Sequence, residues 1–129
     1  MRNIFILLLM TLMAFSLKAQ KTPDEIISSF FKTYENRPDD AVRSLIASKW
    51  IDENSIEQLI SKLWDGVLLM GTYYGYDKIS EKEISESYKI YYYLVKYERQ
   101  PVRFIFNFYK PQSEWLVYSF SFDESFNEK

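Results

Sequence analysis

The hydrophobic pattern of this chain changes its period once, close to Gly71. Before that glycine, apolar residues recur every three or four positions, the spacing that places them on one side of an α-helix. From Thr72 onward the period is two, as in β-strands whose side chains alternate between two faces. The sequence therefore predicts an α+β fold in which helices come first and an antiparallel sheet follows.

Three helix starts are readable in the first half of the chain. Thr22-Pro23-Asp24-Glu25 combines a capping threonine, a first-turn proline and the acid of a capping box, and this helix should end near Asn36. A second helix starts at Pro38-Asp39-Asp40, where two acids suit the first turn. Its expected buried side consists of Val42, Leu45 and Ile46, with Trp50 as a further candidate.

The third helix has the clearest pattern. Asn54 and Glu57 have the spacing of a capping box, and Gly71 is a natural residue to end the helix after Met70. Gly66 lies inside the helix, where glycine costs up to about 1 kcal/mol relative to alanine. The expected apolar side is formed by Ile56, Leu59, Ile60, Leu63, Trp64, Val67 and Leu68.

The second half predicts three strands, over residues 84–98, 102–110 and 115–122, with a short extra strand or extended loop around 73–79. The turns are expected at 99–101 and 111–113, since both contain a proline, which interrupts strand pairing. We pair Tyr97 with Val102 in the first hairpin and Lys110 with Glu114 in the second. A β-bulge would break this register locally.

This register collects twelve apolar or aromatic residues on one sheet face, which we expect to point toward the helices. They are Tyr91, Tyr93, Val95, Tyr97, Val102, Phe104, Phe106, Phe108, Leu116, Tyr118, Phe120 and Phe122. The other face is mixed, as is common in antiparallel sheets. It carries Tyr88, Ile90, Tyr92, Leu94, Lys96, Arg103, Ile105, Asn107, Tyr109, Trp115, Val117, Ser119 and Ser121.

Residues 1–19 have the features of a secretory signal peptide. Arg2 precedes an apolar run from Ile4 to Leu17, and a cleavage site is expected after Ala19. The run is shorter than the roughly 20 residues that span a bilayer. We therefore expect an exported protein, periplasmic or secreted, whose residues 20–129 form a single α+β domain.

Composition excludes several kinds of site. The chain has no histidine and no cysteine, which rules out a Ser-His-Asp triad, a Cys-His pair and the usual zinc or copper sites. Its three glycines do not form a phosphate loop. The net charge is −2 without a basic run, so we expect neither nucleic acid nor, after signal cleavage, a membrane as partner. We expect no metal and no cofactor.

The remaining acids are better explained by structure than by catalysis. Asp39 and Asp40 belong to a helix first turn, and the acids between Glu81 and Glu86 lie in a polar segment typical of a solvated loop or sheet edge. The inner sheet face carries only tyrosine hydroxyls as polar groups. A tyrosine with its ordinary pKa near 10 donates hydrogen bonds but does not serve as a base at neutral pH.

The order of three amphipathic helices and a curved antiparallel sheet resembles the NTF2-like superfamily. The residues that carry the resemblance are Leu63-Trp64 in the third helix, the stop at Gly71 and the closing stretch YKPQSEWLVYSF, and it covers about residues 22 to 123. The resemblance implies a cone, with helices over the concave sheet face and a pocket at its open end. Members of that superfamily include isomerases and dehydratases as well as binding and dimerisation domains.

Two candidate sites follow. A pocket inside the cone would be lined by Tyr34, Trp64, Tyr93, Phe106 and Tyr118, and would suit a small apolar ligand. The alternative is that these rings simply fill the core. An interface on the outer face would use Tyr92, Asn107, Tyr109 and Trp115, as a homodimer contact or for another protein partner.

Taken together, these features predict an exported non-catalytic binding or protein-interaction module with an NTF2-like fold. The alternative is a small-molecule enzyme of the cone-fold type, an isomerase or a dehydratase.

Overall fold

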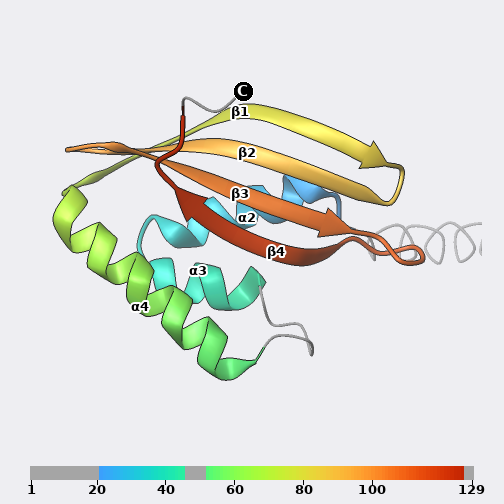
Figure 1. The fold of residues 1–129 in the computed structure, drawn as a ribbon, viewed down its shortest axis with the longest axis horizontal. Helices are drawn as coiled ribbons and strands as arrows, with labels where there is room; N and C mark the ends of the chain where they lie inside the picture. The colour runs from blue at the N-terminus through green and yellow to red at the C-terminus, as the bar shows by residue number, and fades with distance from the viewer. Residues whose placement is uncertain (1–20, 46–51, 127–129) are drawn as a thin grey trace, which may run out of the picture.

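The computed structural model describes residues 21–45 and 52–126. It contains the helices α2 (Pro23–Tyr34), α3 (Pro38–Leu45) and α4 (Glu53–Met70), followed by the strands β1 (Tyr73–Ser85), β2 (Tyr88–Tyr97), β3 (Pro101–Tyr109) and β4 (Leu116–Asp123). The strands form one antiparallel sheet in the order β1-β2-β3-β4. The predicted α+β fold, with helices first and a curved sheet after them, is confirmed (Figure 1). The expected signal peptide, Ile46 and Trp50 lie outside the described residues.

Most helix boundaries follow local sequence signals, and α3 begins at Pro38 as predicted. Thr22 and Glu25 form the predicted capping box, in which the Glu25 amide donates to the threonine hydroxyl over 3.2 Å. Gly71 ends α4 with φ at 85°, a left-handed conformation that favours glycine. The capping box predicted for α4 is wrong, because the helix begins earlier, at Glu53, with Asp52 at the N-cap.

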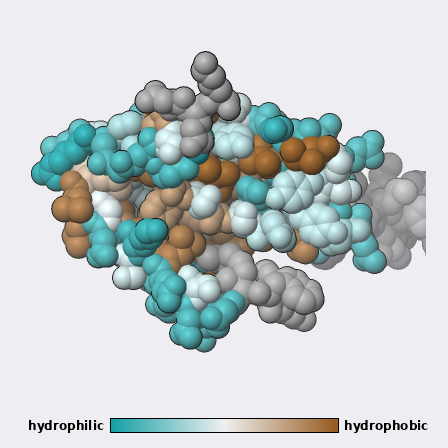
Figure 2. All heavy atoms as spheres, in the orientation of Figure 1, coloured by the Kyte–Doolittle hydropathy of each residue, from teal (hydrophilic) through white to brown (hydrophobic). Residues whose placement is uncertain are grey.

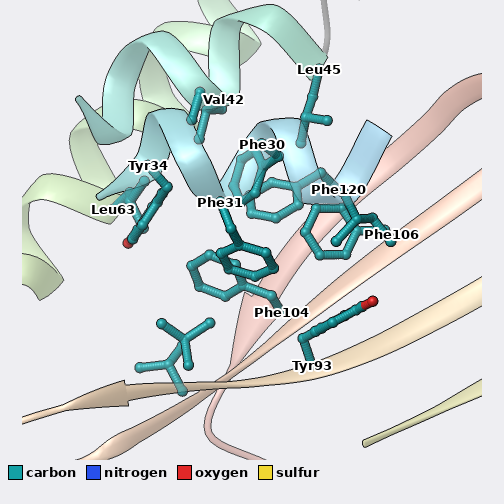
Figure 3. Close-up of a cluster of buried hydrophobic side chains, with 14 of the residues drawn as sticks. Phe30, Phe31, Tyr34, Val42, Leu45, Leu63, Tyr93, Phe104, Phe106 and Phe120 are labelled. Carbon is teal, nitrogen blue, oxygen red and sulfur yellow. The ribbon is translucent and has the colours of Figure 1, made fainter. Parts of the chain in front are cut away.

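One sheet face is covered by α2, which runs behind the strands in Figure 1, while α3 packs on α2 and α4 packs on α3. Half of the buried core residues are aromatic. Phe30 and Phe31 of α2 project onto Phe104 and Phe106 of the sheet (Figure 3). The Phe30 ring centre lies 5.2 Å from that of Phe106 in an edge-on arrangement, a favoured geometry for aromatic pairs.

The predicted first strand is wrong at its beginning. Residues 84–98 do not form one strand, because the chain turns at Glu86 and Ser87 and thereby joins a long β1 to β2. Beyond its first residues, β1 is exposed along both faces. Its sequence therefore lacks the alternation that reveals a half-buried strand. Its charged residues suit a sheet edge that must not pair with another chain.

The first predicted hairpin is displaced by two residues. Tyr93 pairs with Phe104 and Val95 with Val102, whereas the prediction paired Tyr93 with Phe106. A shift by an even number leaves every side chain on its face. Hence the inward positions of β2 and β3 are confirmed: Tyr91, Tyr93, Val95, Tyr97, Val102, Phe104, Phe106 and Phe108 are all buried.

The second hairpin contains a β-bulge that changes the faces of β4. Phe106 pairs with Phe120, but Phe108 pairs with Val117, so β4 has one extra residue opposite Asn107 and Phe108. The predicted inward placement of Leu116 and Tyr118 is wrong, because they are 37% and 63% exposed, and Val117 is buried instead. Beyond the bulge the predicted faces hold, since Phe120 and Phe122 pack on the core.

Candidate functional site

The predicted pocket residues do not converge on one cavity. Tyr34, Tyr93 and Phe106 lie in the core, where the rings of Phe30 and Phe31 fill the space between α2 and the sheet (Figure 3). Trp64 is 39% exposed on α4 and Tyr118 is on the opposite sheet face. The structure thus brings together Tyr34, Tyr93 and Phe106, and these three residues form packed core and not the wall of a pocket.

Within residues 21–45 and 52–126, one buried hydrogen bond joins two side chains. The hydroxyl groups of Tyr34 and Tyr97 are hydrogen-bonded to each other. Burial, followed by the neighbouring Tyr97, raises the pKa of Tyr34 above its ordinary value, and burial also raises the pKa of Tyr97. Both hydroxyls therefore stay neutral at physiological pH and satisfy each other rather than supplying an acid or base.

The open sheet face carries a cluster that we call the tyrosine surface, formed by Tyr88, Asn107, Tyr109 and Tyr118. The Tyr118 ring lies 6.0 Å from that of Tyr88 and 6.4 Å from that of Tyr109, centre to centre. The Asn107 amide donates to the Tyr88 hydroxyl over 2.7 Å. In Figure 2, side chains of intermediate hydropathy gather over the right-hand ends of β2, β3 and β4 on this face.

Two of the four predicted interface residues, Asn107 and Tyr109, belong to the tyrosine surface. Tyr92 lies on the same face but is half-buried beneath the Arg103 guanidinium, which is 5.7 Å from the ring centre. Arg103 in turn donates two hydrogen bonds to the Asp123 carboxylate, of 2.8 and 2.7 Å. This ion pair lies farther along the same face, where Arg103 and Asp123 are cross-strand partners.

The outward placement of Trp115 is wrong. This ring packs against the core, with the Lys89 and Lys110 ammonium groups 5.4 and 4.9 Å from its centre. Trp115 lies just before the bulged strand β4. The bulge turns Trp115 toward the core and places Tyr118 on the open face. Sequence alternation missed Tyr118 for the same reason, since one extra residue inverts the expected faces.

A second feature, not foreseen from sequence, is an open groove between α2 and the start of β1, of about 630 Å³. We call it the α2–β1 groove. Its sheet side is formed by Tyr73, Tyr74, Gly75 and Tyr76, and its helix side includes Ser28 and Lys32. The stretch Tyr73-Tyr74-Gly75-Tyr76 could have indicated this groove, because a glycine inside a strand often marks a β-bulge or a site where another backbone or a ligand comes close.

The described residues hold no group of three or more acids that could bind a metal ion. Within residues 21–45 and 52–126, no helix is long and apolar enough to cross a membrane. Comparisons with protein-family models, curated proteins and solved structures found no match to this chain.

Proposed function

We propose that this protein is a protein-interaction module that self-associates through the tyrosine surface on the open face of its sheet. The observation that carries the proposal is Tyr118, which is 63% exposed although it contacts two other tyrosine rings. Tyrosines are enriched in protein interfaces because each ring buries a large area and its hydroxyl still finds a partner.

A second copy of the chain is the favoured partner because the tyrosine surface bears no formal charge. Two copies related by a two-fold axis bring the same patch together, and like charges on it would repel. Farther along the same face, Arg103 and Asp123 neutralise each other. Leu116, which is 37% exposed beside Tyr109 in the pairing of β3 and β4, extends the patch with apolar area.

The resemblance to the NTF2-like superfamily supports this proposal through the order of helices and sheet and through the curvature of the sheet (Figure 1). It also suggests the alternative of an enzyme. That alternative gains no support from the described residues, because none of their charged side chains is buried in the core. An acid or base with a pKa matched to its task is usually provided by such burial.

The test is sedimentation equilibrium of the wild type beside Tyr118→Ala and Tyr74→Ala. Tyr74 is a matched control, since it is 65% exposed but lies on β1. We expect a reversible dimer whose dissociation constant rises about 30-fold in Tyr118→Ala, the effect of losing about 2 kcal/mol at an interface hot spot. A wild type that stays monomeric at several hundred micromolar would refute the proposal. Its association free energy would then be weaker than roughly −4 to −5 kcal/mol. Equal weakening by both substitutions would also refute it.

A further inference from the structure

The α2–β1 groove owes its shape to a β-bulge in β1. Tyr73 pairs with Tyr97 and Tyr76 with Val95, so both tyrosines point toward α2 although they are three residues apart. Regular alternation would place them on opposite faces. Gly75, with φ at 123°, supplies the conformation that the bulge needs and leaves no side chain between the two rings.

The aromatic wall of this groove is firmly held by the core. The Tyr76 ring stacks on Phe31 with their centres 3.8 Å apart and their planes 8° apart. The Tyr73 ring lies 5.4 Å from Tyr34 and 5.8 Å from Tyr97. Tyr76 is nevertheless 39% exposed and Tyr74 is 65% exposed. A flat ring entering the groove would thus meet preformed aromatic surface, which lowers the entropic cost of binding.

The charged rim of the groove is mainly cationic. Lys32 lines it from α2, Lys96 from β2, and Glu35 is the one acid among the lining residues. No described acid forms an ion pair with Lys32. Lys96 lies 3.5 Å from Asp77, but both side chains of that pair are largely exposed, so the pair is weak and can be exchanged for a ligand.

We propose that the α2–β1 groove binds a small aromatic carboxylate. The ring lies against Tyr76 and Tyr73, and the carboxylate meets Lys32 and Lys96. The volume of about 630 Å³ is in the usual range for small-molecule sites, roughly 300–1,000 Å³. Burial raises the pKa of Tyr73 to about 12, so its hydroxyl remains a neutral hydrogen-bond donor beside the anion. This site lies apart from the tyrosine surface and does not depend on dimerisation.

The test uses two probes that share a ring system and differ in charge, 2-naphthoate and 2-naphthamide. Calorimetric titration of the purified protein should show naphthoate binding about tenfold more tightly than the uncharged amide, a difference of about 1.4 kcal/mol. In Lys32→Gln/Lys96→Gln the affinity for naphthoate should fall to that for the amide. Lys62→Gln/Lys82→Gln is the matched control, because it removes the same charge from exposed positions outside the groove.

A second variant tests the cavity rather than the charge. Ser28 is exposed on α2 and lines the groove, so Ser28→Trp should fill it and abolish binding of both probes while the circular dichroism spectrum stays unchanged. Three results would overturn the proposal. They are equal affinity for the two probes, unchanged naphthoate binding in the Lys32/Lys96 double variant, and no binding of either probe at about 1 mM, the weak limit of specific recognition. The double variant decides the question even if Ser28→Trp fails to fold.

Discussion

The helix-facing and the open face of the sheet both carry aromatic rings, but the rings have different neighbours on the two faces. On the helix-facing side, Phe104 and Phe106 are completely buried under Phe30 and Phe31. On the open side, Tyr118 touches two tyrosine rings and remains 63% exposed. The difference shows that an aromatic residue in a strand becomes core or surface according to whether a helix covers its face.

The hydroxyl groups repeat this contrast. The Tyr34 and Tyr97 hydroxyls are buried and hydrogen-bonded to each other, whereas the Tyr88 hydroxyl accepts from Asn107 at a half-buried site beside solvent. Water can replace a lost partner on the open face but not in the core. The two faces should therefore respond differently to the same substitution.

The largest effect is expected from truncating a ring. Phe106→Ala should lower the free energy of unfolding by about 3–5 kcal/mol, because it leaves a cavity among close-packed rings. Tyr118→Ala should cost less than about 1 kcal/mol in dilute protein, since surface substitutions have small effects. Urea denaturation of both variants measures the difference. Similar losses in the two variants would mean that the open face is packed as tightly as the core.

A smaller effect is expected from removing a hydroxyl. Tyr34→Phe should cost about 1–3 kcal/mol, because the Tyr97 hydroxyl is left buried without a partner. Tyr88→Phe is the matched change on the open face and should cost about 0.5 kcal/mol or less, since the Asn107 amide can turn to water. Thermal unfolding of the two variants side by side gives both values. A Tyr88→Phe loss as large as that of Tyr34→Phe would contradict the comparison.

The smallest effect concerns the ion pair on the open face. Hydrogen bonds from Arg103 lower the pKa of the Asp123 carboxyl. Its contribution to stability is therefore present above the unfolded-state pKa, near 3.9, and is lost as the pH falls through the lower pKa of the folded protein.

Because the Asp123 side chain is 37% exposed, this contribution should be below about 1 kcal/mol. Asp123→Asn should reduce stability at pH 7 by that amount and leave it nearly unchanged at about pH 2. Chemical denaturation at the two pH values measures this. An equal loss at both values would assign the effect to packing instead of charge.

Much of the fold could be predicted because its signals are local. The capping box at Thr22 and the glycine stop at Gly71 each involve a few neighbouring residues, and both are present. The inner residues of β2 and β3 were also predictable, since their faces survive a register shift of two. The long edge strand β1 was harder to predict, because exposure of both faces removes the alternating pattern.

The candidate sites were predicted less well. Asn107 and Tyr109 were placed correctly on the open face. Trp115 was predicted on the open face and Tyr118 on the inner face, and the bulge in β4 reverses both positions. The α2–β1 groove was missed entirely. Its two tyrosines share a face only because of the bulge at Gly75.

By itself, the sequence determined the order of helices and strands and the two-residue alternation, because both depend on residues that are close along the chain. Only the tertiary structure decided the register and the positions of the bulges. These depend on hydrogen bonds between distant strands, and hydrophobic alternation cannot distinguish registers that differ by two residues. A bulge of one residue, by contrast, reverses the faces of a strand, and such a reversal places Tyr118 on the open surface of this protein.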